Sequence, residues 1–414
     1  MTGLIRTFLN RGGAGVVISS FIYKVILLLY PLILVRVVSI KEYGEFELAR
    51  SLVLVLSPFF CLGMHEALLK FAAVKINTEV NYILKKIFVP AMFSCFILAG
   101  FAFLSTLVLP SSFSVPGKIA PFSIYIITWG GFLLISNYFR AKHENAYFSL
   151  YTLLSSIFIL LLFFIFYKAE INDFEVYALV FSPVGATLTL LMVLLYKGYD
   201  FTVKRSSFSL KAYAVYGTYI GVGGIVSQLA LVLDVIMLGW YLSDTELVGF
   251  YKLSTIIPSL FIFIATIYFK SEFGSIVKMD SACIVRYYMQ YVTHFIVLAS
   301  VFFGIAIFFY EDIYKTLFNA ELDVKFYYVF LILVFTALVS VLVRVPLGNI
   351  LNARGYASFN VKNAILALIL NILMNYFFIA QYGVVGAAIG TAVSIFITGG
   401  LQLIKFRGIT NGKR

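Results

Sequence analysis

Six side chains that could bind a polar or charged ligand lie inside long apolar stretches of this sequence. Four are basic, one is acidic and one is an amide: Lys24, Arg50, Lys252, Arg344, Asp234 and Gln228. A charged group at the centre of a bilayer costs at least ~2.5–3.5 kcal/mol, so such residues face a water-filled cavity or an opposite charge. The pattern therefore indicates a site for a polar ligand within a membrane.

Lys24 is the deepest of the basic residues. It lies about eleven residues into the first apolar stretch, or ~16 Å along a helix that rises 1.5 Å per residue. This depth is close to the bilayer centre and too great for the ammonium group to extend comfortably to the interface. Either Lys24 binds an anionic group of a substrate or it forms a structural ion pair, and we favour the first interpretation.

The other candidates leave two interpretations open. Arg50, Lys252 and Arg344 could bind substrate or extend to the nearer membrane face. Asp234 is the only acidic residue deep in a span: it either pairs with Lys252 or takes up and releases a coupling proton or sodium ion, because a desolvated carboxylate binds a proton more readily. Gln228 is a candidate for contacts with sugar hydroxyl groups.

The elements that must position these residues are membrane-spanning helices. Of the 414 residues, 62% are hydrophobic and 12% are charged, with a mean hydropathy of +1.00, which excludes a water-soluble protein. The apolar runs are long enough to cross ~30 Å of hydrocarbon as helices, and the first is too long for a signal peptide. The predicted spans are residues 13–38, 46–69, 87–109, 121–139, 149–167, 176–195, 213–242, 248–269, 291–309, 326–351, 360–379 and 384–404.

The loop charges predict the orientation of these spans. Lysine and arginine gather on one side, as at Lys85, Lys86 and Arg354, whereas acidic residues such as Glu170 and Asp173 gather on the other. Because the basic side is the cytoplasmic one, we expect both termini in the cytoplasm. An even number of spans agrees with this orientation.

The chain divides into two halves of six predicted spans. A polar linker at 199–212 separates an N-terminal lobe, 1–198, from a C-terminal lobe, 213–414. Three residues match between the halves at one constant offset: Gly44, Phe46 and Leu48 correspond to Gly249, Tyr251 and Leu253. Halves of equal orientation imply parallel repeats, a transporter architecture. The predicted fold class is an all-α polytopic membrane protein with about twelve transmembrane helices in two six-helix lobes.

The charge balance within the spans bears on the ligand. The net charge is +12, but the basic residues follow the membrane topology, so we expect no nucleic-acid partner. Within or near the spans, basic residues outnumber acidic ones: Lys24, Arg36, Arg50, Lys252 and Arg344 stand against Asp234 and Glu47. A central cavity should therefore be electropositive and suit an anionic cargo, such as a diphosphate.

Motifs for a cofactor or a metal site do not occur. The cysteines, Cys61, Cys95 and Cys283, are isolated in the sequence and are interpreted as packing residues. The three histidines lack ligand spacing. We expect no cofactor, no metal and no catalytic residue.

Three segments resemble a known family: KEYGEFELARSLVLVLSPFFCLGMHEALLKFAA, LDVIMLGWYLSDTELVGFYKLSTIIPSLF and LGNILNARGYASFNVKNAILALILNILMNYFFIAQYGVVGAAIGTAVS. They are similar to the polysaccharide transporter family of the multidrug/oligosaccharidyl-lipid/polysaccharide (MOP) exporter superfamily. Within it, the chain resembles O-antigen flippases of the Wzx type.

This resemblance implies two lobes around a central cavity lined by the first and seventh helices, with alternating access. The implied cargo is an undecaprenyl-diphosphate-linked O-antigen repeat unit, moved from the cytoplasmic to the periplasmic leaflet of the bacterial inner membrane. Antiport of H⁺ or Na⁺ is implied as the driving force. An O-antigen polymerase and a chain-length regulator are implied partners.

Three alternatives stay open at this point. A multidrug or other small-molecule exporter of the same superfamily would carry cationic compounds in an acidic or aromatic cavity. A membrane-bound glycan polymerase or glycosyltransferase would need a sizeable extramembrane loop or an acidic catalytic cluster, and neither occurs in the sequence. A scaffold without transport would keep its activity after Lys24→Ala.

Overall fold

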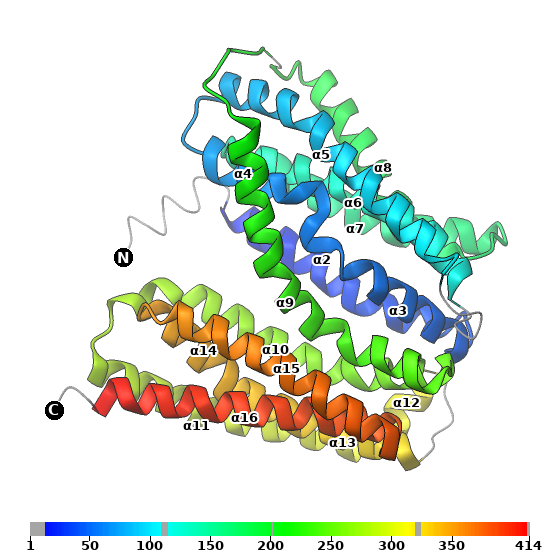
Figure 1. The fold of residues 1–414 in the computed structure, drawn as a ribbon, viewed down its shortest axis with the longest axis vertical. Helices are drawn as coiled ribbons and strands as arrows, with labels where there is room; N and C mark the ends of the chain where they lie inside the picture. The colour runs from blue at the N-terminus through cyan, green and yellow to red at the C-terminus, as the bar shows by residue number, and fades with distance from the viewer. Residues whose placement is uncertain (1–12, 109–114, 201, 319–323, 412–414) are drawn as a thin grey trace. The chain divides into compact units, whose positions relative to one another are not determined.

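The computed structural model describes residues 13–108, 115–200, 202–318 and 324–411 (Figure 1). The described residues form helices joined by short turns, and they contain no strand. This all-helical architecture is expected in lipid, where a helix satisfies its own backbone hydrogen bonds. The all-α part of the predicted fold class is therefore confirmed.

Ten helices in the described ranges are long and apolar enough to cross a membrane. They are α5 (Asn77–Ser105), α6 (Pro116–Ala141), α7 (Asn145–Lys168), α8 (Phe174–Tyr196), α9 (Leu210–Leu242), α10 (Thr245–Lys278), α11 (Ser281–Phe308), the span Val324–Ala353, α15 (Ala357–Tyr382) and α16 (Val384–Asn411). The short helix α12 (Tyr310–Phe318) follows α11. The chain is thus a multi-pass membrane protein.

Two further apolar segments precede these ten. The first is α2 (Gly13–Leu34). The second is a bent pair that meets at 42°. One arm is α3 (Ile40–Leu54), and the other, Ser57–Ala72, consists of the short segment η1 (Ser57–Gly63) and α4 (Met64–Ala72). The count of twelve spans and their orientation stay predictions.

The break at η1 has a local cause. Pro58 stands at its start, where a proline cannot donate a helical hydrogen bond. Three consecutive residues then adopt positive φ angles: Cys61 at 55°, Leu62 at 51° and Gly63 at 64°. A left-handed turn cannot continue an α-helix, so the predicted span 46–69 is two helices rather than one.

The span Val324–Ala353 also departs from a regular helix. It consists of α13 (Val324–Val339), a π-helical turn, η2 (Ser340–Arg344), and α14 (Val345–Ala353). Tyr288 and Tyr291 of α11 donate hydrogen bonds to the carbonyls of Leu342 and Val341, at 3.1 and 2.9 Å. These tyrosines satisfy backbone groups that the π turn exposes, which explains how the turn is tolerated.

The structure divides into two compact units. The first contains the chain up to Leu34 and Ala49–Gln228; the second contains Val35–Leu48 and the chain from Leu229 onward. In the first, α7 packs on α2 and α8; in the second, α16 packs on α13 and α15. The order of the spans in the sequence predicts the lobes 1–198 and 213–414, whereas the two units reflect contacts between residues. The division into two six-span lobes stays a prediction.

Close approaches between helices depend on glycine. In the second unit, a Cβ atom on Gly44 would lie 1.6 Å from the Thr245 carbonyl oxygen, and one on Gly249 would lie 2.4 Å from the Ile40 carbonyl oxygen. In the first unit, a Cβ on Gly224 would lie 3.0 Å from Pro58. The crossing at Gly44 and Gly249 is possible only because glycine lets backbones approach closely.

Two cysteines that are isolated in the sequence meet at the break. The sulfur atoms of Cys61 and Cys95 lie 3.6 Å apart, and both thiols are free and buried. The left-handed turn at Cys61 directs the chain against α5, which carries Cys95. The spacing of Cys61 and Cys95 in the sequence does not indicate this contact, because the contact depends on the break in the helix at η1.

Candidate functional site

Asp234 lies in a polar cluster within the second unit, between α9, α10, α15 and α16. Three side chains donate hydrogen bonds to its carboxylate: Tyr251 Oη to Oδ2 at 2.8 Å, Asn375 Nδ2 to Oδ1 at 2.7 Å, and Thr391 Oγ1 to Oδ2 at 2.6 Å. Asn371 completes the cluster, because its Nδ2 donates to Thr391 Oγ1 at 3.1 Å. The structure thus surrounds a half-buried carboxylate with neutral donors.

The cluster differs from the ion pair that the sequence allowed for Asp234. Lys252 Nζ lies 3.8 Å from Glu47 Oε2 instead, and the Glu47 side chain is only 2% exposed. Within the described ranges, no basic side chain forms an ion pair with Asp234. The structure thus gives the Asp234 carboxylate neutral hydrogen-bond donors in place of the Lys252 ammonium group.

A pocket of about 320 Å³ lies in the first unit, against the break between α3 and α4. Its walls come from η1, α4, α6 and the first part of α9: Ser57, Pro58, His65, Glu66, Trp129, Leu133, Ile220, Gly224 and Gln228. His65 is buried, with Nε2 3.7 Å from Glu66 Oε1. Gln228 therefore lines a pocket that offers an aromatic ring, a carboxylate and an amide.

Trp129 belongs to a stacked set of aromatic rings in the same unit. Its ring centroid lies 5.5 Å from that of Tyr125, 4.6 Å from Phe132 and 5.9 Å from Tyr23, all in stacked geometry. Phe132 stacks in turn on Tyr151 at 4.6 Å. Because positions 125, 129 and 132 share one face of α6, the helix itself builds this aromatic wall.

Two of the predicted basic residues belong to this unit. Arg50 is half-buried, and its charge acts on the phenol groups of Tyr23 and Tyr125. Lys24 follows Tyr23 on α2 and is exposed. The structure therefore brings Arg50 to the aromatic wall, whereas the substrate role of Lys24 stays a prediction.

Arg344 ends the π-helical turn in the second unit. It is half-buried, and within the part of the chain that the structure describes it forms no ion pair with a carboxylate. Irregular turns of this kind occur frequently at functional positions. The sequence gave no signal for the turn itself, because Ser340–Arg344 has no glycine or proline.

Several residues of these sites escaped the sequence analysis. Trp129 and Glu66 line the pocket, and Tyr251 and Thr391 bind Asp234. The spacing of aromatic residues on α6 was a usable signal, but it is common in membrane helices. Within the described ranges, no group of three His, Cys, Asp or Glu side chains could hold a metal ion.

The fold is that of known membrane transporters. At 13% identity, the chain resembles a structure titled "Inward-facing conformation of a multidrug resistance MATE family transporter of the MOP superfamily", with a TM-score of 0.59 over 93% of this chain and 98% of that one. The multidrug transporter DinF-BH in complex with R6G gives 0.64 at 13% identity, over 94% and 93%. The lipid II flippase MurJ, inward closed conformation, gives 0.62 at 13% identity, over 95% and 87%.

This fold defines a class, the multi-pass membrane proteins with MATE-like and MurJ-like architecture. Sequence comparison narrows the class further. Residues 9–269, well over half of the chain, match the family described as polysaccharide biosynthesis protein, and this chain belongs to that family. No curated protein sequence matches the chain significantly.

Proposed function

We propose that this protein is a flippase for lipid-linked oligosaccharides in the bacterial inner membrane. It moves an undecaprenyl-diphosphate-linked O-antigen repeat unit from the cytoplasmic to the periplasmic leaflet by alternating access, with both termini in the cytoplasm. The observation that carries this proposal is the pocket beside the aromatic wall, in a member of a polysaccharide biosynthesis family. An O-antigen polymerase and a chain-length regulator are its proposed partners, and we propose no catalytic activity.

The pocket suits a saccharide by its chemistry. A sugar ring presents an apolar face that packs on an aromatic ring, and hydroxyl groups that need both donors and acceptors. Trp129 offers the ring, while Glu66 accepts and Gln228 both donates and accepts hydrogen bonds. These three side chains support a contact with one or two sugar units of the cargo.

The diphosphate needs cations, because burying its bare charge would be prohibitive. Lys24 and Arg50 are the proposed ligands in the first unit, and Lys252 and Arg344 in the second. Lys252 already pairs with Glu47 at 3.8 Å, so its contribution should be the weakest of the four. Arginine suits this role because its planar donors match phosphate oxygens in pairs.

Asp234 is the proposed coupling site. Its carboxylate, the side-chain oxygens of Asn371 and Thr391 and the hydroxyl of Tyr251 form an oxygen-rich cluster. Protonation or sodium binding would neutralise the carboxylate, and both rearrange the three donor hydrogen bonds. Binding of a proton or sodium ion to Asp234 would thus change the contacts between α9, α10, α15 and α16. Antiport requires a contact of this kind, which has one arrangement with the ion bound and another without it.

Leaflet-resolved translocation of a diphosphate-linked oligosaccharide in proteoliposomes tests the proposal. We expect Lys24→Ala and Trp129→Ala to lower the rate by roughly tenfold, the loss of one charged hydrogen bond or one aromatic contact. Lys168→Ala, an exposed residue at the end of α7, is the matched control for charge. Equal rates for Lys24→Ala, Trp129→Ala and Lys168→Ala would refute this assignment.

The coupling ion is tested in the same vesicles. With an imposed proton or sodium gradient, Asp234→Asn should abolish the stimulation by the gradient, because an amide neither titrates nor carries charge. Asp244→Asn is the control, since Asp244 caps α10 through hydrogen bonds from backbone N–H groups and asparagine caps equally well. Stimulation that survives Asp234→Asn would exclude Asp234 as the coupling site.

A drug exporter is the second candidate, and the same pocket supports it. Glu66 and the aromatic wall would attract an aromatic cation as well as a sugar. Efflux of a cationic dye, measured beside oligosaccharide translocation, separates the two functions. Dye transport that Glu66→Gln abolishes, without oligosaccharide translocation, would favour the exporter.

A further inference from the structure

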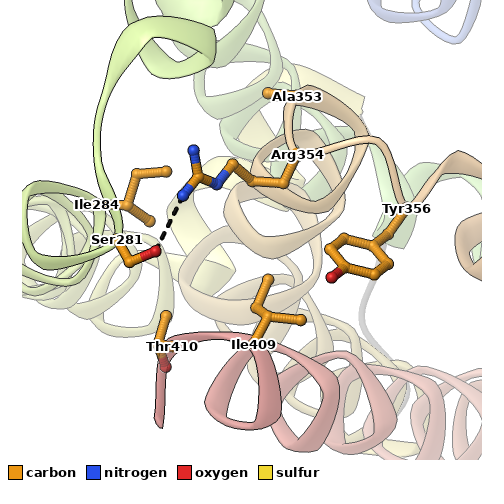
Figure 2. Close-up of a pocket in the computed structure, with 7 residues that line it drawn as sticks. All are labelled: Ser281, Ile284, Ala353, Arg354, Tyr356, Ile409 and Thr410. Atoms are coloured by element: carbon orange, nitrogen blue, oxygen red, sulfur yellow. Dashed lines mark hydrogen bonds between the residues drawn. The ribbon is translucent and has the colours of Figure 1, made fainter. Parts of the chain in front are cut away.

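A second pocket, of about 330 Å³, lies in the second unit at the ends of its helices, far along the chain from the aromatic wall. It is formed by the turn between α10 and α11, the turn between α14 and α15, and the end of α16. Figure 2 shows the side chains of Arg354, Tyr356, Ser281 and Thr410 arranged around it. Its wall therefore combines a guanidinium group with three hydroxyl groups.

Arg354 is held in place by neutral acceptors. Its Nη1 donates to the Met279 carbonyl oxygen at 2.9 Å. Its Nη2 donates to Ser281 Oγ at 3.0 Å, as Figure 2 shows. Within the described ranges no carboxylate forms an ion pair with it. Because a guanidinium carries five N–H groups, donors remain for an anion in the pocket. The Asp280 carboxylate attracts the Arg354 charge without forming an ion pair with it. The guanidinium is thus positioned by neutral acceptors, and its charge is only partly compensated.

The segments around the pocket are strongly basic. Residues 276–290, 353–362 and 403–411 contain six basic side chains and one acidic: Lys278, Arg286, Arg354, Lys362, Lys405 and Arg407 against Asp280. The Asp280 carboxylate already accepts a hydrogen bond from the backbone N–H of Cys283 at 2.7 Å. Lys405 Nζ lies 4.6 Å from the centre of the Tyr356 ring. The local field therefore attracts anions, above all phosphate.

The surroundings of the pocket favour a lipid over a soluble anion. The helix ends beside it carry exposed apolar side chains: Val277 on α10, Val361 on α15 and Ile404 on α16, exposed by 48%, 60% and 68%. In a membrane, such side chains contact acyl chains, while basic pockets at helix ends on the cytoplasmic side bind anionic headgroups. The loop charges predict that this end is the cytoplasmic one.

We propose that this pocket binds the phosphate of an anionic phospholipid headgroup. Arg354 contacts two phosphate oxygens, Ser281 donates a hydroxyl hydrogen bond, and Lys405 adds charge at the rim. The hydroxyl of Thr410 already donates to the Phe406 carbonyl oxygen at 3.0 Å, so it lines the pocket without serving as a donor. The bound headgroup bridges the α10–α11 turn, the α14–α15 turn and α16, so it stabilises this end of the unit. The site is independent of the transported cargo.

The test is lipid binding by the full-length protein in detergent, followed by native mass spectrometry and thermal unfolding. Phosphatidylglycerol and cardiolipin are the probes, and phosphatidylcholine is the zwitterionic control. We expect Arg354→Gln to weaken anionic-lipid binding by roughly tenfold and Lys405→Gln by a smaller factor. Lys405→Gln breaks none of the hydrogen bonds of Arg354, so it reports on binding even if Arg354→Gln impairs folding. Lys315→Gln on α12, an exposed lysine far along the chain from the pocket, is the charge control.

Three outcomes decide the proposal. A preference for anionic lipid that both variants weaken and Lys315→Gln does not would support it. Equal retention of phosphatidylcholine and phosphatidylglycerol, or binding unaffected by both variants, would overturn it. A further measurement with inorganic phosphate distinguishes a lipid headgroup from a free anion. If millimolar phosphate raises the melting temperature as much as phosphatidylglycerol does, the site binds a free anion, and the lipid assignment is overturned.

Discussion

The two copies of the repeated segment, α3 with its continuation and α10, begin alike and end differently. Each copy starts with a capping side chain, and the two caps lie 205 residues apart in the sequence. Ser39 accepts a hydrogen bond from the N–H of Glu42. Asp244 accepts hydrogen bonds from the N–H groups of Glu246 and Leu247. The first copy then breaks at η1, whereas α10 runs without interruption from Thr245 to Lys278.

Matched positions in the two copies contact each other within the second unit. Gly44 and Gly249, one offset apart, form the same close helix crossing. Glu47 and Lys252, also one offset apart, form an ion pair at 3.8 Å. Opposite charges at these two matched positions attract each other, whereas equal charges there would repel. That the two segments are repeats stays a prediction.

The copies differ at one matched position, where Tyr251 corresponds to Phe46, and in the chain that follows the matched start. The break after α3 provides Ser57, Pro58, His65 and Glu66 as walls of the aromatic pocket. The unbroken α10 instead presents Tyr251 to Asp234. The first segment of the matched pair therefore leads into a pocket suited to a ligand. The second contacts a carboxylate suited to an ion. This division of tasks is what substitutions can test.

The largest expected effect comes from the glycine crossing. Gly44→Ala places a methyl group where the Thr245 carbonyl stands, 1.6 Å from the ideal Cβ position, and a backbone atom cannot rotate away. We expect a loss of about 3 kcal/mol or more in the free energy of unfolding. Thermal unfolding in detergent measures it. Gly100→Ala on α5, with open space around its Cβ, should be neutral or slightly stabilising, and equal losses at both positions would disprove the close crossing.

The second effect concerns the carboxylate cluster. Tyr251→Phe gives the second copy the side chain that the first has at Phe46, and it removes the 2.8 Å hydrogen bond to Asp234. A hydrogen bond to a charged group contributes about 1.5–3 kcal/mol, so the melting temperature should fall accordingly. Tyr376→Phe, on an exposed side chain of α15, is the control. A fall no larger than that of the control would mean that the hydroxyl does not serve Asp234.

The ion pair between matched positions should show measurable coupling. In a double-mutant cycle, Glu47→Gln and Lys252→Gln are combined, and the double variant should lose less stability than the sum of the singles. We expect a coupling energy of about 0.5–2 kcal/mol, because the Glu47 side chain is buried although Lys252 is 24% exposed. Strict additivity in thermal unfolding would show that the two charges do not interact.

The smallest effect is expected at a helix cap outside the spans, after α10. The backbone N–H of Cys283 donates to Asp280 and lowers the pKa of that carboxyl. A lowered pKa stabilises the folded state above the ordinary carboxyl value, near ~3.9, and the contribution is lost as the pH falls below it. Asp280→Ala should therefore lower the melting temperature slightly at pH 7, with the difference shrinking toward pH 3. A difference that grows on acidification would reverse the sign of the argument.

Much of the architecture follows from the sequence alone. Apolar runs of bilayer length fix membrane helices, because lipid offers no other partner for backbone groups. The rarity of charge within those runs singles out Asp234 and Arg344. Likewise, the sequence alone matches Gly44 with Gly249, and the structure shows that the two residues meet at one close crossing.

The hydrogen-bond partners of the polar residues, by contrast, are determined by the tertiary structure. Asp234 could have paired with Lys252, but helix packing brings Tyr251, Asn375 and Thr391 to it. Those residues come from three helices up to 157 positions away, and no local pattern encodes such a distance. Similarly, the turn at Cys61 makes the aromatic pocket, although Pro58 alone is compatible with a continuous helix, as Pro258 within α10 demonstrates. The sequence determines which polar groups must be shielded from lipid. Packing between helices that are distant in the sequence determines which groups form hydrogen bonds with them.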